Sequence, residues 1–177
     1  MRIIAITGFS IHNKNFGANE FQLWLKTVKQ KQANEILIRE PVWNKKNQLL
    51  ALKLADENHF IPILHNAKFE NPFGYYHWSR HFLNQKPKYK GYHGISCHNL
   101  EELKIAENHL YDYAFLSPIY PTESHPNTPE LGINYLKTCV KNCKISIIAL
   151  GGIQQKNQIQ EIKEAGAKGF ASIRYFI

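Results

Sequence analysis

The stretch SIIALGGIQQKNQIQEIKEAGAKGFASI, residues 146–173, contains the pattern from which the fold can be derived. It begins with an apolar run, 146–150, that has the length and β-branched content of a buried strand. A glycine pair then leads into an amphipathic segment, 155–165, and Gly166 marks the expected end of this helix before a second apolar run, 169–173. The order strand, helix, strand predicts two parallel strands joined by a right-handed crossover.

The same alternation extends outward through the rest of the chain. We expect strands at 2–7, 35–39, 60–64, 75–78, 92–96, 114–118, 146–150 and 169–173, and helices at 19–31, 44–57, 100–110, 132–140 and 155–165. Within the first helix, Phe21, Leu25 and Val28 fall on one face, as in a helix packed against a sheet. Asn99, followed by Leu and two glutamates, has the form of a helix N-cap.

Eight strands in this order predict a (β/α)₈ barrel of the TIM type, formed by one domain, 1–177. Such barrels usually need about 250 residues, so part of the outer ring of helices must be reduced. The segments 66–74 and 79–91 have turn-forming and polar residues in place of a helical pattern, and the sequence stops at Ile177, directly after the eighth expected strand. We therefore expect reduced helices after strands three and four and no eighth helix. An open doubly wound sheet is the structural alternative.

Composition places the chain in the globular class. Its 177 residues are 44% hydrophobic and 20% charged, which excludes disordered, collagen-like and coiled-coil chains. Lys and Arg outnumber Asp and Glu by 22 to 14, but without a polybasic run or a nucleic-acid motif we expect no nucleic-acid partner. No apolar run has the length of a membrane span and no signal peptide is present, so no membrane partner is expected. Three cysteines without Cys-x-x-Cys spacing agree with reduced thiols in the cytoplasm.

Active sites of TIM barrels form at the C-terminal ends of the strands, so the residues that follow each strand are the candidate site. Gly151 and Gly152 open a helix, where their N–H groups could bind a phosphate; a tight turn without a ligand is the alternative. His98 is a candidate general acid or base, or else a structural histidine. Arg39 could pair with an anionic ligand or with the adjacent Glu40.

Three further histidines, His65, His77 and His125, are expected on the same rim. Imidazoles on neighbouring strand ends could bind zinc. Because neither a carboxylate nor His-x-His spacing accompanies them, we predict no metal ligand among these residues.

Three blocks in the C-terminal half have distinctive residues and spacing: GISCHNLEE at 94–102, YDYAFLSPIYPTES at 111–124 and ALGGI at 149–153. They resemble the thiamine phosphate synthase and thiazole tautomerase (TENI-type) family of barrels. Synthases of this family join a pyrimidine diphosphate to a thiazole phosphate, with magnesium on the leaving group. The resemblance therefore implies a phosphorylated small molecule as the binding partner.

The resemblance also implies roles for individual residues. On the thiazole phosphate side it places Thr122, Ser124, the N–H groups of Gly151 and Gly152, and the backbone around Arg174. On the diphosphate or pyrimidine side it places Arg39, Asn66 and Ser96.

The charged part of the synthase pattern is largely missing. Pro41 and His125 stand where the family has lysines, Ala67 stands where it has an aspartate, and the segment 78–81 lacks the expected magnesium-binding aspartate. Magnesium needs oxygen ligands, so we expect no cofactor unless synthase activity is retained.

The tautomerase branch of the family does not need that metal, and His98 matches its acid/base histidine. A thiazole-tautomerase-like enzyme is therefore the leading hypothesis. A divergent synthase, in which Arg39 and His125 replace lost cationic contacts, is the second. The third is a non-catalytic barrel that binds a phosphorylated ligand as a sensor or partner subunit. A homodimer would cover the flank of the first and eighth strands, where no helix is expected.

Overall fold

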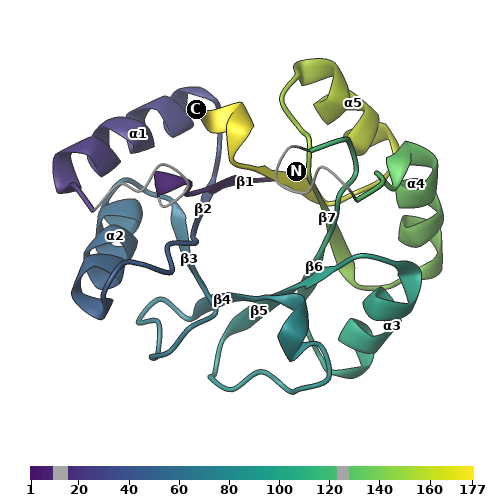
Figure 1. Cartoon of the computed structure of the whole chain (residues 1–177), viewed down its shortest axis with the longest axis horizontal. Helices are drawn as coiled ribbons and strands as arrows, with labels where there is room; N and C mark the ends of the chain where they lie inside the picture. Colours follow the sequence, from purple (N-terminus) through teal and green to yellow (C-terminus); the bar gives the residue numbers. More distant parts are fainter. Residues whose placement is uncertain (10–15, 123–127) are drawn as a thin grey trace.

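A computed structural model describes residues 1–9, 16–122 and 128–177. The described residues form eight parallel strands that close into a barrel in chain order (Figure 1). These strands are β1 (Arg2–Ile6), β2 (Glu35–Ile38), β3 (Ile61–His65), β4 (Tyr75–Trp78), β5 (Tyr92–Cys97), β6 (Tyr113–Leu116), β7 (Ser146–Leu150) and β8 (Gly169–Ser172). Because β1 pairs with both β2 and β8, the predicted barrel is confirmed and the open sheet is wrong.

Five α-helices in the described part of the chain surround the barrel (Figure 1). They are α1 (Ala18–Gln30), α2 (Lys45–Glu57), α3 (Leu100–Asn108), α4 (Gly132–Asn142) and α5 (Lys156–Glu164). Helix α1 buries the predicted face of Phe21, Leu25 and Val28. The Asn99 side chain accepts the Glu102 N–H at 2.8 Å, which confirms the N-cap of α3. None of these helices has both the length and the apolar character that a membrane span requires.

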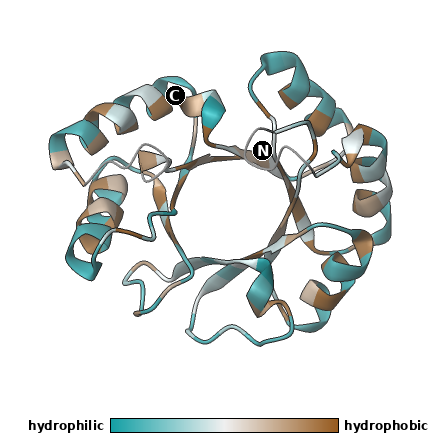
Figure 2. Ribbon diagram, viewed as in Figure 1, coloured by the Kyte–Doolittle hydropathy of each residue, from teal (hydrophilic) through white to brown (hydrophobic). Residues whose placement is uncertain are grey.

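Apolar side chains occupy two concentric layers. One lies between the outer face of the strands and the helices, whose hydrophobic sides face the barrel in Figure 2. The other fills the barrel interior and includes Ile4, Leu37, Ile63, Phe115 and Ile148. Since alternate residues of a strand point to opposite faces, most strands contribute apolar side chains to both layers, whereas β5 has Gly94 and Ser96 on its inner face.

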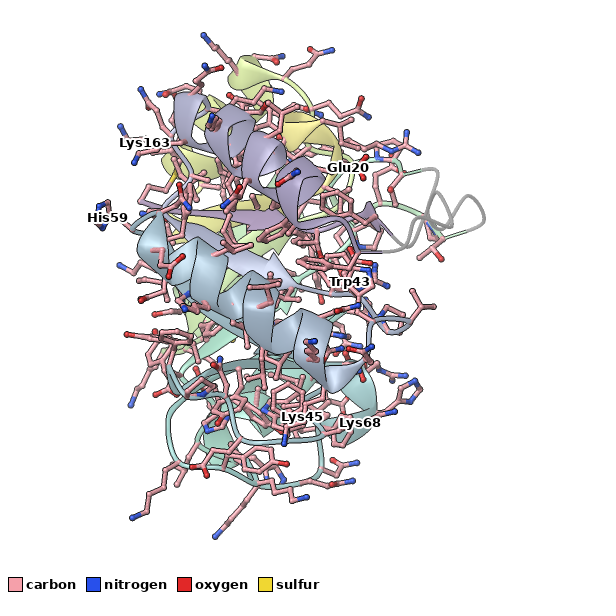
Figure 3. The ribbon with its side chains drawn as sticks, turned by 90° about the vertical axis from the view of Figure 1, so that its left-hand side faces the viewer. Glu20, Trp43, Lys45, His59, Lys68 and Lys163 are labelled. Carbon is pink, nitrogen blue, oxygen red and sulfur yellow. The ribbon has the colours of Figure 1, made fainter. Side chains whose placement is uncertain are left out.

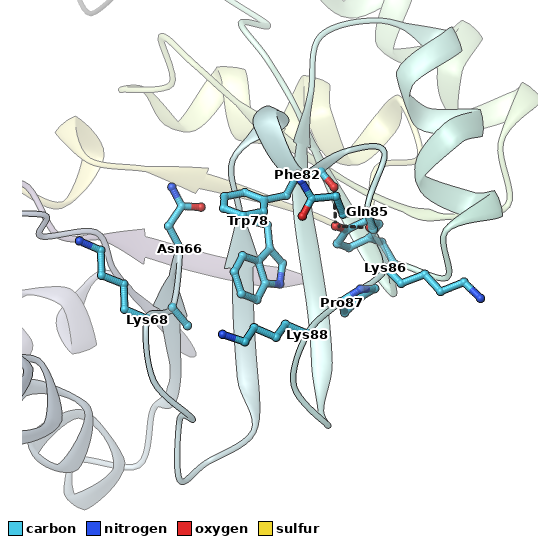
Figure 4. A pocket seen from close by; sticks show the side chains of 10 residues that line it. Asn66, Lys68, Trp78, Phe82, Gln85, Lys86, Pro87 and Lys88 are labelled. Atoms are coloured by element: carbon cyan, nitrogen blue, oxygen red, sulfur yellow. Dashed lines mark hydrogen bonds between the residues drawn. The ribbon is translucent and has the colours of Figure 1, made fainter.

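The outer ring is reduced after β3 and β4, as the sequence predicts. Residues 66–74 contain no helix, and β4 is followed by a single 3-10 turn, η2 (Arg80–Phe82). Aromatic rings from this region cover the strands instead: Tyr76 stacks on His93 with ring centroids 4.8 Å apart, and on Tyr89 at 5.4 Å. The Tyr111 hydroxyl donates to the carbonyls of Phe82 and Gln85 at 3.0 Å (Figure 4).

These side chains leave a cavity of about 530 Å³ on the outer side of β4 (Figure 4). Its lining combines a floor of Trp78, Phe82 and Tyr111 with polar side chains around it. Asn66 and Lys68 belong to this lining and also to that of a second cavity at the barrel mouth.

After β8 the described residues form a 3-10 turn, η3 (Arg174–Phe176), and no α-helix. Phe176 is fully buried and stacks on Phe170 of β8 with parallel rings and centroids 6.2 Å apart. The Lys31 ammonium donates to the carbonyl of Tyr175 at 2.6 Å. The turn therefore covers part of the outer flank of β8 that was expected to be bare.

Candidate functional site

The mouth of the barrel contains a cavity of about 620 Å³ over the C-terminal ends of β1, β2 and β3. Side chains of both predicted and unpredicted residues line it: Thr7, Gly8, Arg39, Glu40, Pro41, Trp43, Asn44, Lys45, Gln48, His65, Asn66, Lys68 and Phe69. The Thr7 hydroxyl accepts the Arg39 N–H at 2.9 Å, which ties the ends of β1 and β2 together. Two predicted residues, Arg39 and Asn66, thus share one cavity.

Positive charge dominates this mouth cavity. Arg39, Lys45 and Lys68 contribute three cations to its lining, and Figure 3 shows Lys45 and Lys68 side by side. Its one carboxylate, Glu40, is buried and accepts the Phe9 N–H at 2.9 Å. A cavity with this charge and with side-chain amides suits an anionic small molecule.

Sequence reasoning missed the two lysines of this cavity. Lys45 is the first residue of α2, and Lys68 lies two residues beyond Asn66. The position of Lys45 at the mouth could have been predicted, because the helix that follows β2 must begin at the mouth of a barrel. Lys68 could not be placed, since its segment has no regular structure from which a direction can be derived.

His77 lies beneath the mouth, inside the barrel, and is 1% exposed. Its Nε2 is 2.9 Å from the Ser96 hydroxyl and its Nδ1 is 3.3 Å from the Tyr113 hydroxyl. Phe115 stacks on the imidazole with ring centroids 3.9 Å apart. Burial, followed by the charges of neighbouring groups including His65, holds the pKa of His77 well below its usual value, so the ring is neutral.

His65 lies above it, stacked on His77 with ring centroids 6.1 Å apart, and lines the mouth cavity. Burial and the nearby Arg39 guanidinium lower the pKa of His65 to about 4. Both rim histidines of β3 and β4 are therefore neutral at physiological pH. Neither of them contributes a positive charge to the mouth.

These two histidines should make stability depend on pH. In the unfolded chain this histidine takes up a proton near pH 6.5, whereas in the folded protein His65 does so only near pH 4. The free energy of unfolding is therefore highest above pH 6.5 and decreases as the pH falls to 4. The loss through His65 amounts to about 3 kcal/mol. Urea denaturation between pH 4.5 and 7 measures it. His65→Gln should flatten the slope, and His81→Gln, an exposed histidine, should not; an unchanged slope in His65→Gln contradicts the assignment.

His98 follows β5 and is exposed. Its backbone N–H donates to the Glu102 carboxylate at 2.8 Å, and its Nδ1 lies 2.8 Å from the Ser117 carbonyl oxygen. A carbonyl oxygen only accepts, so Nδ1 is the protonated nitrogen and Nε2 keeps the lone pair of the neutral ring. This tautomer is the one that a general base working through Nε2 requires.

Gly151 and Gly152 both have positive φ, 96° and 68°, and press against the loop that follows β6. A Cβ on Gly151 would lie 2.8 Å from Pro118, and one on Gly152 would lie 2.4 Å from the Pro121 carbonyl oxygen, so neither position has room for a side chain. The carbonyls of Leu150 and Gly151 accept the N–H groups of Ile119 and Tyr120. These contacts join the turns after β6 and β7 into one structure beside His98.

Of the remaining predicted residues, Thr122 and Arg174 are described. Thr122 is half-buried in the loop after β6, whereas Ser124 and His125 lie outside the described residues. Ser172 donates to the Ile153 carbonyl at 2.8 Å and its hydroxyl accepts the Tyr175 N–H at 3.1 Å, so the turn containing Arg174 is tied to the end of β7. The Arg174 side chain is exposed.

The donors of this mouth do not fit magnesium. Ala67 has no ligand atom, and Arg80, after β4, forms a salt bridge with Glu102 at 2.6 Å. In the described part of the chain no three His, Cys, Asp or Glu side chains are grouped as metal ligands. The amides, neutral imidazoles and cations found here bind anions, whereas magnesium prefers carboxylate and other oxygen ligands.

Binding of an anion at this mouth should therefore be independent of magnesium. We expect the affinity for inorganic phosphate to be unchanged between 5-fold excess Mg²⁺ and excess EDTA, within about twofold. Titration calorimetry at constant ionic strength measures it. Replacing both Lys45 and Lys68 by Gln should weaken the binding, and the same change at Lys163, on α5, serves as the control. A marked gain in affinity with Mg²⁺ would show that the protein does recruit the metal.

Geometry and topology together define a TIM-type barrel whose polar and cationic residues converge at the C-terminal ends of its strands. A family model described as thiamine monophosphate synthase matches residues 85–176. The chain therefore belongs to the thiamine monophosphate synthase (TMP-TENI) family, a family of thiamine biosynthesis.

Curated relatives support this assignment over slightly less than half of the chain. The thiamine-phosphate synthase of Methanococcus maripaludis is 35% identical over 80 residues, 45% of this chain and 38% of that protein. That of Archaeoglobus fulgidus is 34% identical over 86 residues, 48% of this chain and 40% of that protein. The chain thus matches less than half the length of these relatives.

Solved structures extend the likeness of the fold to nearly the whole chain. Thiamine phosphate pyrophosphorylase from Pyrococcus furiosus superposes with a TM-score of 0.73 at 18% identity, covering 97% of this chain and 85% of that one. A geranylgeranylglyceryl phosphate synthase from Thermoplasma acidophilum reaches 0.72 at 10% identity, covering 99% and 85%. At these identities the likeness concerns the fold alone.

Proposed function

We propose that this protein binds a thiazole phosphate and acts as a thiazole-tautomerase-like isomerase, with His98 as its acid/base. The observation that carries the proposal is the 2.8 Å contact between His98 Nδ1 and the Ser117 carbonyl, which leaves Nε2 able to accept a proton. The same loop after β6 packs on the Gly151–Gly152 turn. A substrate whose phosphate binds at that turn would have its ring near His98.

In this mechanism the chain's residues bind, orient and move one proton. The phosphate accepts hydrogen bonds from the backbone N–H groups of the Gly151–Gly152 turn, which precedes α5. His98 Nε2 removes a proton from one carbon of the thiazole phosphate carboxylate and returns it to another, while the double bond of the substrate shifts, so that atoms and charge balance. The Ser117 carbonyl stabilises the imidazolium that exists between these two steps, because it accepts the Nδ1–H bond throughout.

Two measurements test the proposal. Titration calorimetry with thiazole phosphate should give saturable binding, and its absence would remove the proposal. NMR should then follow isomerisation of the thiazole phosphate carboxylate. Binding without turnover would identify the protein as a non-catalytic sensor or partner subunit.

One observation favours a divergent synthase as the second candidate. Arg39, Lys45 and Lys68 place three cations on the side of the mouth opposite the Gly151–Gly152 turn, where a diphosphate would need them. Formation of thiamine phosphate from a pyrimidine diphosphate and thiazole phosphate would establish this alternative and overturn the tautomerase.

A further inference from the structure

A chain of three hydrogen-bonding side chains runs through the barrel interior toward the mouth. Tyr113 of β6 is fully buried, His77 of β4 is buried next to it, and Ser96 of β5 is half-buried above. The contacts are 3.3 Å from Tyr113 Oη to His77 Nδ1 and 2.9 Å from His77 Nε2 to Ser96 Oγ. Ser96 is the only one of the three that is not fully buried, so the two deeper residues act through it.

The single N–H of the neutral His77 ring can sit on either nitrogen, and Tyr113 decides which. Its hydroxyl can donate to His77 Nδ1 at 3.3 Å or to the Tyr76 carbonyl at 3.4 Å. A phenol is a stronger donor than an aliphatic hydroxyl, because its oxygen bears negative charge more readily. The Arg2 guanidinium over the Tyr113 ring, 4.2 Å from the centroid, favours this donation and opposes the burial that raises the pKa of Tyr113.

We propose that Tyr113 donates to His77 Nδ1, that His77 therefore keeps its proton on Nε2, and that Ser96 receives this N–H and must turn its own O–H toward the mouth. Ser96 is then an obligate donor. It selects a hydrogen-bond acceptor such as a phosphate or carboxylate oxygen and disfavours an N–H group at the same place. Tyr113 and His77 are positioning residues, and the link to a thiazole phosphate rests on the proposed function.

The chain of hydrogen bonds from Tyr113 through His77 to Ser96 forms a relay, and packing holds the His77 imidazole in the orientation that it needs. Phe115 stacks on one side of His77 at 3.9 Å, and His65 lies parallel to it within 18° at 6.1 Å. Gly94, in β5, makes room for Tyr113: a Cβ there would lie 2.0 Å from the tyrosine ring. The absence of a side chain at position 94 is thus a steric condition for the relay.

The first arm of the test needs no ligand. In ¹⁵N-histidine-labelled protein at pH 7, long-range ¹H–¹⁵N spectra should show His77 as the Nε2–H tautomer. Observation of the Nδ1–H tautomer would overturn the proposal. Tyr113→Phe should lower the Nε2–H fraction, and the matched control Tyr75→Phe, which removes another interior phenol, should leave it unchanged.

The second arm measures the affinity for inorganic phosphate by calorimetry in a double-mutant cycle. Ser96→Ala should weaken binding by about tenfold or more, and Tyr113→Phe by about threefold to tenfold. In the Ser96→Ala background Tyr113→Phe should have no further effect, because its influence passes through Ser96. An equal loss in both backgrounds contradicts the relay. If thiazole phosphate does not bind to the unmodified protein, the proposed function fails, and the tautomer of His77 still decides this inference.

Discussion

Replacing His98 with alanine is expected to reduce the rate of thiazole phosphate carboxylate isomerisation by about 10² to 10⁴. The loss arises because His98 Nε2, in the proposed mechanism, is the group that accepts and returns the proton. Binding of the substrate should change little, since the phosphate contacts lie at the Gly151–Gly152 turn. NMR assays of isomerisation and calorimetric titrations of the same variant separate the two effects.

His81→Ala is the matched control for this experiment, because His81 is an exposed histidine near the same end of the barrel. An unchanged rate in His98→Ala would refute the assigned role of His98. A loss of substrate affinity equal to the loss of rate would indicate that His98 binds the substrate instead of moving its proton.

Replacing Glu35 with glutamine is expected to lower the free energy of unfolding by about 3 to 5 kcal/mol. Glu35, 3% exposed, accepts two hydrogen bonds from the Arg2 guanidinium, at 2.7 and 2.6 Å, at the N-terminal end of the barrel. Glutamine would leave the Arg2 cation partly buried without an opposite charge. Chemical denaturation of the variant measures the loss.

The control for this prediction replaces both partners. Arg2→Leu combined with Glu35→Leu removes the charges together, and should recover most of the stability that Glu35→Gln loses. If the double replacement is as unstable as the single one, the pair acts through packing and not through its charges. The relay of the barrel interior would also respond, because Arg2 lies over Tyr113.

Much of the fold could be predicted because local patterns and global topology agree in this chain. The eight apolar runs match β1–β8 to within one or two residues at each end. The sixth strand ends at Leu116, two residues earlier than expected, because Pro118 has no N–H to continue the ladder. The reduced segments after β3 and β4 could be predicted from their prolines and glycines.

The site could be predicted only in part. The rule that barrel sites form at the ends of strands predicted Arg39 and Asn66 as site residues, and both line one cavity with His65. It could not show that His77 lies beneath Ser96 instead of opening into the cavity, since that depends on the register of β4 against β5. Tyr113 was missed because nothing in the residues of β6 shows that a phenol would meet an imidazole 36 positions earlier in the chain.

The sequence by itself determined the barrel, the reduced helices after β3 and β4, and the departure from the magnesium-binding pattern. The barrel and its reduced helices follow from short-range periodicity and turn chemistry, and the departure from the magnesium-binding pattern follows from the family that the sequence resembles. Only the tertiary structure decided which nitrogen of His98 is protonated, how His77 is connected to Ser96, and that Lys45 and Lys68 share a cavity with Arg39. Each of these depends on distances between atoms that are far apart in the sequence. Those distances are set when the barrel closes.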